Sequence, residues 1–464
     1  MIGGGFSGNF PRKGNKKKGE STLGPVQGGA NAHDKAKGFV DNGPRIQPGA
    51  RAHGPSFTDN GPRVIPPASR GHGQGVDKES PNWTPNVDPV RPLEVIWNGI
   101  IHGVSGYSKA NREIVKRLDS IMKVRFSPDM HFLDAEADEE GKQIYSGHKR
   151  TEVSNSAPRV TFLPPRKEPK AAHRIIYTMM ETEIVHPDMI RLMNENYEEC
   201  WTPTHWNGQT FRQSGLRLPI NVMPLGVDPA IYAPSLPARM PMATLMSTHE
   251  YGKSEQPSGF VFCYVFQPSM RKGLDFLLSA FEEAFFADQE VGLLLGTTAY
   301  ALQGTGMLPN RDLKTRVWAL QGKYTERDLA AMYRACKVYV CTSRGEGWNM
   351  PVTEAAACGL PVIVPRTTVH PELVPSTYGL FFDQDEYRVF PEAKKVSAWF
   401  DGIPFPEYGA NAKRTLVEIL RTIKKEYSTA LVMGKRYSGY VRSKYTWGTS
   451  ARLIGDRLKA IQST

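Results

Sequence analysis

The sequence lacks any apolar run long enough to cross a membrane. A bilayer-spanning helix needs about 20 apolar residues in succession, whereas the apolar stretches at 260–266 and 291–295 have the length of strands. The N-terminal residues, with Arg12, Lys13 and the lysines at 16–18, contain no apolar segment of the kind found in a secretory signal. These absences predict a chain without a transmembrane segment.

Cysteine is scarce, and its spacing excludes two common uses of the residue. The five cysteines are odd in number and form no Cys-x-x-Cys pair: Cys200, Cys263, Cys336, Cys341 and Cys358. We therefore expect neither a disulfide framework nor a zinc site, and we expect a reducing, cytoplasmic location. No cluster of Asp, His and Cys has the spacing of metal ligands, and no Ser, His and Asp are arranged as in a hydrolase.

Glycine and proline are concentrated at one end of the chain. Residues 1–92 hold 17 of the 43 glycines and 12 of the 36 prolines, about a third of the positions in that range, a composition typical of disordered segments. The same range contains 13 Lys and Arg against 7 Asp and Glu, so +6 of the formal net charge of +11 lies there. We expect residues 1–92 to form a disordered basic tail.

The tail contains a twofold repeat. Phe39-Val-Asp-Asn-Gly-Pro-Arg45 recurs as Phe57-Thr-Asp-Asn-Gly-Pro-Arg63, and Asp-Asn-Gly-Pro is a turn-forming sequence. One interpretation is a flexible linker with an accidental duplication. The other is a short binding motif presented twice, with the Phe and Arg of each copy as its contacts. The lysines at 16–18 add a weak indication of a polyanionic partner.

From residue 93 onward, strand-like and helix-like segments alternate. We expect strands at 93–101, 124–126, 160–163, 175–177, 260–266, 291–295 and 338–341, separated by stretches with apolar side chains at helical spacing. This is the rhythm of a parallel sheet with crossover helices. The interpretation is an α/β chain of two Rossmann-like, doubly wound domains, 93–225 and 226–464, that face each other across a cleft. A ligand would then bind at the carboxyl ends of the strands.

The segment 340–364 carries the clearest chemical signal. It reads as strand, Gly-Glu-Gly turn, helix and second strand, and Pro351 suits the first turn of the helix. The amides of 347–349 would face outward from the helix N-terminus, an arrangement that binds phosphate. Glu346 and Glu354 would repel phosphate, but they would accept hydrogen bonds from the hydroxyls of a sugar and a ribose. The alternative is a pair of solvated acids, which are favoured at a helix start.

The motifs around this segment resemble the signature of the retaining GT-B glycosyltransferases of family GT4. The likeness extends through Glu346, Glu354 and the Gly-Leu-Pro-Val-Ile beyond them, and it continues at Arg271-Lys272-Gly273, 322–329, Gly226-Val-Asp228, Ser105-Gly-Tyr107 and 202–207. It covers residues from about 93 to 464 and leaves out the tail. Residues 93–225 would be the acceptor domain and 226–464 the nucleotide-sugar donor domain.

The resemblance implies a donor site without metal or cofactor, in which the nucleotide-sugar is a co-substrate. Glu354 would accept both ribose hydroxyls, and Lys272 and Arg271 would neutralise the diphosphate. The backbone of Gly347, Trp348 and Asn349 would assist them, and the loop with Gly103 and Ser105 would approach the phosphates from the first domain.

Two carboxylates are expected at the transferred sugar. Glu346 would hold its hydroxyls and stabilise charge as the glycosidic bond breaks. In the first domain, Glu181 takes the position where the family often has a histidine, with His186 in reserve; a helix-capping role is the alternative for Glu181. Thr367 and Thr368 are expected near the donor.

The sequence departs from the family at two positions near the donor. Phe266 and Gln267 stand where the family has an arginine, so Arg271 is expected to replace it, the alternative being a surface arginine. The family's Gly-Phe-Gly becomes Gly347-Trp348-Asn349, which would put a larger side chain at the mouth of the site. Elsewhere, we expect a structural role for His205 and core positions for Trp206 and Phe211.

The function implied is a retaining glycosyltransferase that moves a sugar from a nucleotide-sugar to a hydroxyl acceptor. One alternative is the same chemistry on modified DNA bases, where the basic tail would contact the DNA phosphates. Another is a non-catalytic protein that binds nucleic acid or glycan on the same scaffold. A sugar phosphorylase would need a lysine that carries pyridoxal phosphate, for which the sequence gives no sign. The acceptor itself is not indicated.

Overall fold

The computed structural model describes residues 93–103, 105–126, 139–149, 151–169, 173–246, 252–302, 313–322 and 324–463. All belong to one of the two units into which the chain divides; the other unit, Asn9–Val90, lies outside these ranges. The tail, its repeat and the lysines at 16–18 therefore lie outside the described residues, and our expectations about them stay predictions.

Six parallel strands form the first sheet, in the order β2-β1-β3-β4-β5-β6. The strands are β1 (Glu94–Gly99), β2 (Lys123–Phe126), β3 (Arg159–Phe162), β4 (Arg174–Tyr177), β5 (Glu199–Thr202) and β6 (Ile220–Val222). The helices between them are α1 (Gly106–Leu118), α2 (Glu139–His148), α3 (Pro187–Asn196) and α4 (His205–Gln213). We call this sheet with its helices the first lobe, and its four expected strands are confirmed.

Eight strands form the second sheet, in the order β14-β13-β12-β9-β10-β11-β7-β8; at one edge, β7 is antiparallel to both β11 and β8. They are β7 (Ala243–Leu245), β8 (Ser254–Glu255), β9 (Phe260–Val265), β10 (Val291–Thr298), β11 (Arg316–Leu320), β12 (Val338–Val340), β13 (Val362–Pro365) and β14 (Gly379–Phe382). The order reverses between β9 and β12, the point at which ligands bind in doubly wound sheets. The three strands expected here are confirmed.

Helices and a two-stranded ribbon complete the second lobe. The helices are α5 (Leu274–Ala284), α6 (Ala299–Leu302), α7 (Glu326–Ala335), α8 (Met350–Ala357), α9 (His370–Leu373), α10 (Ala393–Val396), α11 (Ala410–Lys425) and α12 (Tyr427–Lys444), and the ribbon pairs β15 (Glu386–Val389) with β16 (Pro404–Glu407). Thr325 and Asp328 form a capping box at the start of α7. Within the described ranges, no helix is both long and apolar enough to cross a bilayer.

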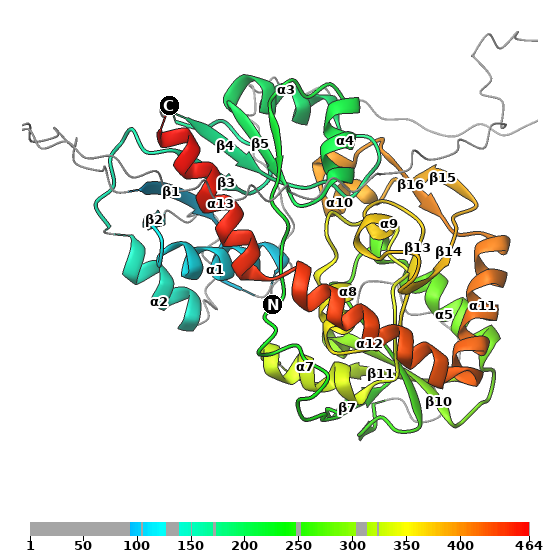
Figure 1. Cartoon of the computed structure of the whole chain (residues 1–464). Helices are drawn as coiled ribbons and strands as arrows, with labels where there is room; N and C mark the ends of the chain where they lie inside the picture. Colours follow the sequence, from blue (N-terminus) through cyan, green and yellow to red (C-terminus); the bar gives the residue numbers. More distant parts are fainter. Residues whose placement is uncertain are drawn as a thin grey trace, which may run out of the picture. The chain divides into compact units, whose positions relative to one another are not determined.

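The chain passes between the lobes at two points that lie side by side. Val227 forms a β-bridge with Thr446, so the segment that enters the second lobe touches the segment that leaves it. A Cβ on Gly226 would lie 2.3 Å from the backbone of Thr446 and Trp447, and only glycine fits this approach. The last helix, α13 (Trp447–Gln462), then packs against α1 of the first lobe (Figure 1).

A buried ion pair fastens α13 to the first sheet. Arg457 on α13 donates two hydrogen bonds to Glu199 of β5, at 2.6 and 3.0 Å. Glu199 is only 1% exposed and also accepts hydrogen bonds from the indole of Trp201 and the amide of Asn221. A buried carboxylate needs such a set of partners because burial removes its hydration. Although α13 and the first sheet are far apart in the sequence, they therefore form one structural unit.

The ribbon region also packs on the first lobe. Phe390, Phe400 and Phe405, from the segment that contains β15, α10 and β16, share an apolar cluster with side chains of α3 and α4 such as Met189 and Phe211. Phe211 therefore lies in a core, as expected. Trp206, which we also expected in the core, is only partly buried; it lies in the first turn of α4, where its backbone amide donates to Glu372.

We predict that Arg457→Met destabilises the fold by about 2–3 kcal/mol, because it leaves the buried Glu199 carboxylate without its cationic partner. The measurement is the free energy of unfolding from urea titration. Arg452→Met is the control on the same helix: Arg452 pairs with Asp456 at the exposed surface, so its removal costs less than about 0.5 kcal/mol. Equal losses in the two variants would contradict the anchoring role of Arg457.

Candidate functional site

Three loops that follow parallel strands meet at one place. Arg271 and Lys272 lie in a short 3-10 helix after β9, Glu346 lies in the loop after β12, and Glu181 lies in the loop after β4 of the first lobe. The first two loops flank the reversal of strand order in the second sheet, and the third comes from the first sheet. The topology therefore brings together the residues that the sequence predicted for the diphosphate and the sugar.

Four charged side chains form a network at this place. Lys272 Nζ donates to Glu346 Oε1, and the Arg271 guanidinium lies 3.2 Å from Glu346 Oε2. The same guanidinium lies 3.7 Å from Glu181 Oε1 and also donates to the carbonyl of Gly345. The Arg271 side chain is 13% exposed, so it is not the surface arginine that was the alternative interpretation.

Burial and charge act in opposite directions on the two acids. Burial opposes ionisation of Glu346, but the charges of Lys272 and Arg271 outweigh it and lower its pKa to about 2. For Glu181, burial dominates and raises the pKa, although Arg271 opposes the shift. Burial, reinforced by the charge of Arg271, lowers the pKa of Lys272. Glu346 is therefore an anion at neutral pH, and a proton is held more easily on Glu181.

The loop before α8 presents its backbone to this network. Asn349 precedes the helix with a left-handed φ of 69°, and Pro351 lies in the first turn as expected. Among the described residues, no acceptor contacts the amides of Gly347, Trp348 and Asn349. Free amides at a helix start form an anion-binding arrangement.

Trp348 corrects one expectation. Its side chain does not lie at the mouth of the site: it is 2% exposed and packs edge-on against Tyr445, with ring centroids 5.1 Å apart. The physical reason is the apolar core under α8 and α12, which takes up the indole while the backbone of the loop stays at the site. The side chain of Trp348 is therefore not available to a ligand.

Asn349 is held by a buried histidine. Its Nδ2 donates to His370 Nε2 at 2.9 Å, and the other ring nitrogen of His370 donates to the carbonyl of Thr367 at 3.0 Å. Both contacts suit a neutral ring, and burial lowers the pKa of His370 to about 4. Sequence reasoning missed His370. Thr368 lies beside Glu346, since its Oγ1 accepts a hydrogen bond of 3.3 Å from the Glu346 amide. Its closeness to the donor stays a prediction.

The second acid, Glu354, meets the first lobe directly. Its Oε1 accepts a hydrogen bond of 2.7 Å from Lys109 of α1, and its Oε2 accepts one of 3.3 Å from the hydroxyl of Tyr333. Lys109 Nζ also lies 3.0 Å from Glu326 Oε2 and 3.0 Å from the hydroxyl of Tyr232. Lys109 and Glu326 were missed, because residue spacing does not reveal that α1 faces α7 and α8.

The remaining first-lobe candidates lie close to the start of α1. Gly103 has a left-handed φ of 89°, and its carbonyl accepts from Arg112 at 2.9 Å. Ser105 caps α1 through its side chain, which accepts from the amide of Ser108. Tyr107 follows in the first turn, and burial raises its pKa, with a further contribution from the charge of Glu181. Tyr107 thus lies near the charged network, and the approach of Gly103 and Ser105 to the phosphates stays a prediction.

Two histidines have structural positions. His186, the reserve for the sugar contact, caps α3 by accepting from the amide of Asp188 at 3.2 Å, and its ring packs against Trp399. It therefore does not join Glu181 in the network. His205 begins α4, where its amide and that of Trp206 donate to the carboxylate of Glu372 on α9, at 2.9 and 2.7 Å.

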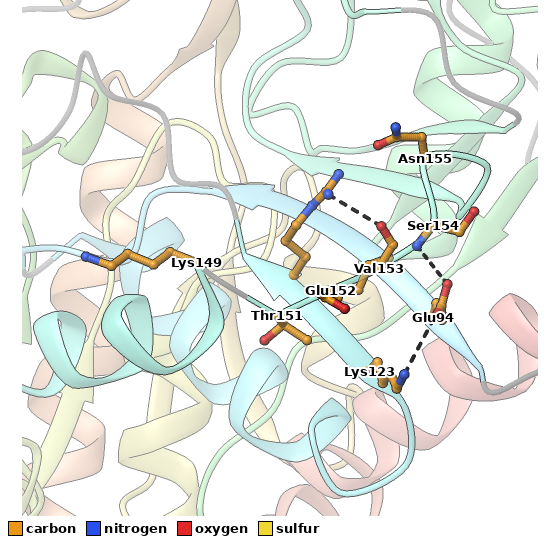
Figure 2. A pocket seen from close by; sticks show the side chains of 9 residues that line it. Glu94, Lys123, Lys149, Thr151, Glu152, Val153, Ser154 and Asn155 are labelled. Atoms are coloured by element: carbon orange, nitrogen blue, oxygen red, sulfur yellow. Dashed lines mark hydrogen bonds and ion pairs between the residues drawn. The ribbon is translucent and has the colours of Figure 1, made fainter.

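A polar pocket of about 630 Å³ lies at the opposite end of the first sheet (Figure 2). Glu94 and Lys123, which begin β1 and β2, line it and form an ion pair at 3.9 Å. This end carries the amino termini of the strands, away from the loops described above. Among the described residues, no three His, Cys, Asp or Glu side chains are grouped so as to hold a metal ion; independence of metal stays a prediction.

Comparison with known proteins gives a partial family match and several similar structures. Residues 259–394 match the family model of the group 1 glycosyl transferases. Sucrose-phosphate synthase from Thermosynechococcus elongatus superposes with a TM-score of 0.57 and 14% identity, over 80% of this chain and 99% of that one. HepE from Anabaena, in complex with UDP and glucose, gives 0.53 and 13%, over 79% and 100%. A glycosyltransferase from Rickettsia africae gives 0.53 and 11%, over 80% and 99%.

These similarities establish the fold. The chain has the two-lobed α/β architecture of the GT-B glycosyltransferases, which confirms the expected fold class. The matched segment 259–394 includes every second-lobe residue of the candidate site, from Arg271 to Glu354. No curated protein sequence matches the chain significantly.

We predict a loss of stability in acid that depends on His370. Because its folded pKa of about 4 lies below the value of about 6.5 for an unfolded histidine, its contribution is complete above pH 6.5 and is lost as the pH falls through 4. The loss attributable to this ring is about 3 kcal/mol. The free energy of unfolding from urea titration at pH 7, 5.5 and 4 should therefore fall less steeply for His370→Gln. His205→Gln, which changes an exposed ring, should keep the wild-type slope; equal slopes in all three proteins would contradict the prediction.

Proposed function

We propose that this protein is a glycosyltransferase that moves a sugar from a nucleotide-sugar donor to a hydroxyl acceptor with retention of the anomeric configuration, as in family GT4. The observation that carries the proposal is the Glu346 carboxylate held by Lys272 and Arg271 beside three free backbone amides. The group 1 match over 259–394 supports it, and so does the fold shared with HepE, whose structure holds UDP and glucose.

The cations and the amides supply the diphosphate site. A diphosphate would contact Lys272 and Arg271 and accept hydrogen bonds from the amides of 347–349. Its negative charge would replace that of Glu346 as the partner of Lys272. Glu346 would then be free to accept hydrogen bonds from the transferred sugar, the role expected for it.

Glu354 would hold the ribose. Glu354 is 6% exposed, and its carboxylate already accepts hydrogen bonds from a lysine and a tyrosine hydroxyl. The hydroxyl groups of a ribose can take the places of these two hydrogen-bonding groups. Lys109 keeps Glu326 as a partner when this exchange occurs. The nucleoside would therefore lie on the α7 and α8 side of the second lobe.

The reaction would be a front-face substitution. The bond between the anomeric carbon and the diphosphate oxygen breaks, the acceptor oxygen bonds to that carbon from the same face, and the acceptor proton passes to the departing diphosphate. The positive field of Lys272 and Arg271 stabilises the leaving group. Glu346 and Glu181 stabilise the positive charge that develops on the sugar ring.

A nucleotide screen tests the proposal. Thermal shift with UDP, GDP and ADP should show stabilisation by one of them in excess over the others, since binding to the folded state alone raises the melting temperature. With the matching nucleotide-sugar, slow hydrolysis should release the sugar with its original anomeric configuration, as read by proton NMR before mutarotation. Absence of any nucleotide binding would overturn the proposal, and an inverted product would overturn retention.

We predict that substitution of one acid mainly lowers donor affinity and substitution of the other mainly lowers turnover. Glu354→Gln should weaken donor affinity about 10- to 100-fold, because it removes a charged acceptor from the ribose. Glu346→Gln should lower turnover about 100-fold or more without weakening nucleotide affinity, because the carboxylate competes with the diphosphate for Lys272 and Arg271. Isothermal titration with the selected nucleotide and donor hydrolysis separate the two effects. Glu418→Gln, at an exposed position of α11, is the control and should change neither quantity.

The acceptor and the location remain predictions. Transfer to modified DNA bases depends on the basic tail, which lies outside the described residues, so no contact described here favours it. All five cysteines are buried and unpaired, which supports the reducing, cytoplasmic location that we propose. The non-catalytic alternative predicts nucleotide or glycan binding without donor hydrolysis, and the screen above distinguishes it.

A further inference from the structure

One buried amide of the first lobe touches both loops of the proposed sugar site. Asn207 lies in the first turn of α4 and is fully buried. Its Oδ1 accepts a hydrogen bond of 2.7 Å from the amide of Met180, in the loop that carries Glu181. Its Nδ2 donates to the carbonyl of Gly347, in the loop that follows Glu346, also at 2.7 Å.

The partners of Asn207 determine its orientation. Met180 offers a donor and Gly347 an acceptor, and Thr204 Oγ1 accepts a further hydrogen bond of 2.8 Å from Nδ2. A flipped amide would set donor against donor and acceptor against acceptor. Aspartate, although it has the same shape, would place a carboxylate oxygen against the Gly347 carbonyl. Only asparagine satisfies both loops.

The two loops approach each other closely at glycines. A Cβ on Gly345 would lie 1.8 Å from the carbonyl oxygen of Glu181, and a Cβ on Gly347 would lie 2.5 Å from the side chain of Met179. The loops are therefore in backbone contact, and Asn207 is the hydrogen-bonding link beside that contact. A displacement of one loop is transmitted to the other.

The link also sets the direction of one free amide. In a trans peptide the C=O and the following N–H point in opposite directions. Because Asn207 holds the Gly347 carbonyl, the amide of Trp348 is directed away from Asn207, and among the described residues it has no acceptor. Without this anchor, no hydrogen bond among the described residues would fix the direction of the Gly347 carbonyl and of the Trp348 amide that follows it.

We infer that Asn207 is a positioning residue that aims the Trp348 amide at the distal phosphate of the donor and aligns Glu181 with Glu346. This inference rests on the proposed function, because it takes the diphosphate to lie at the amides of 347–349. Under this inference the first lobe helps to hold the donor, although Asn207 itself does not touch the donor.

The experiment compares UDP with UMP on the full-length protein, or the guanosine or adenosine pair if the screen selects another base. Asn207→Asp should lower the affinity for the diphosphate at least about tenfold and that for the monophosphate less than about threefold. A structural defect lowers the folded fraction equally for both ligands, so their affinity ratio would not move. Asn207→Ala, which removes the anchor without adding charge, provides the same test should the Asp variant fail to fold.

Asn111→Asp is the matched control. Asn111 is equally buried and likewise satisfied on both sides of its amide, but by Trp97 and Tyr107 within the first lobe. Its substitution should lower stability and leave the affinity ratio unchanged. A wild-type protein that binds no nucleoside diphosphate would overturn the proposed function and this inference together. A wild-type preference for the diphosphate that persists in the folded Asn207 variant would overturn the inference alone.

Discussion

The structure depends on the pairing of buried charges where the loops of two sheets meet. Ionised groups persist at low solvent exposure only when opposite charges and hydrogen bonds replace their hydration. Arg271, Lys272, Glu346 and Glu181 satisfy one another there, with two charges of each sign. A ligand that displaces the acids therefore meets the two basic side chains, Lys272 and Arg271. This is the electrostatic condition for binding a diphosphate and for directing a carboxylate at what the diphosphate carries.

The contacts between the lobes differ in kind with their distance from this site. Around the site they are polar: Lys109 with Glu354, Asn207 with Gly347, and the Glu372 carboxylate with the first amides of α4. Farther away, the phenylalanines of the ribbon region make an apolar contact with side chains of α3 and α4. Polar contacts can be exchanged for water or for ligand groups at little net cost, whereas apolar ones cannot.

Much of the second lobe was predictable from its residues. The strands at 260–266, 291–295 and 338–341, the capped helix after Thr325 and the turn before Pro351 all follow from local rules of periodicity, capping and turn formation. The closeness of Arg271, Lys272 and Glu346 also follows, because the loops after β9 and β12 flank the reversal of strand order. Trp348 was misplaced for the opposite reason: whether a large side chain lines a site or fills a core depends on neighbours such as Tyr445 that are distant in the sequence.

What the sequence alone determined is the alternation of strands and helices and the chemical character of the loops at their carboxyl ends. Those properties are local, since each depends on residues within a few turns of one another. Only the tertiary structure decided that Lys109 meets Glu354, that His370 supports Asn349, that Asn207 joins the loops of both lobes, and that α13 returns to the first sheet through Arg457. These contacts join positions between about 20 and 260 residues apart. The spacing of residues along the chain does not predict these contacts, because they arise from the way in which separately formed elements pack.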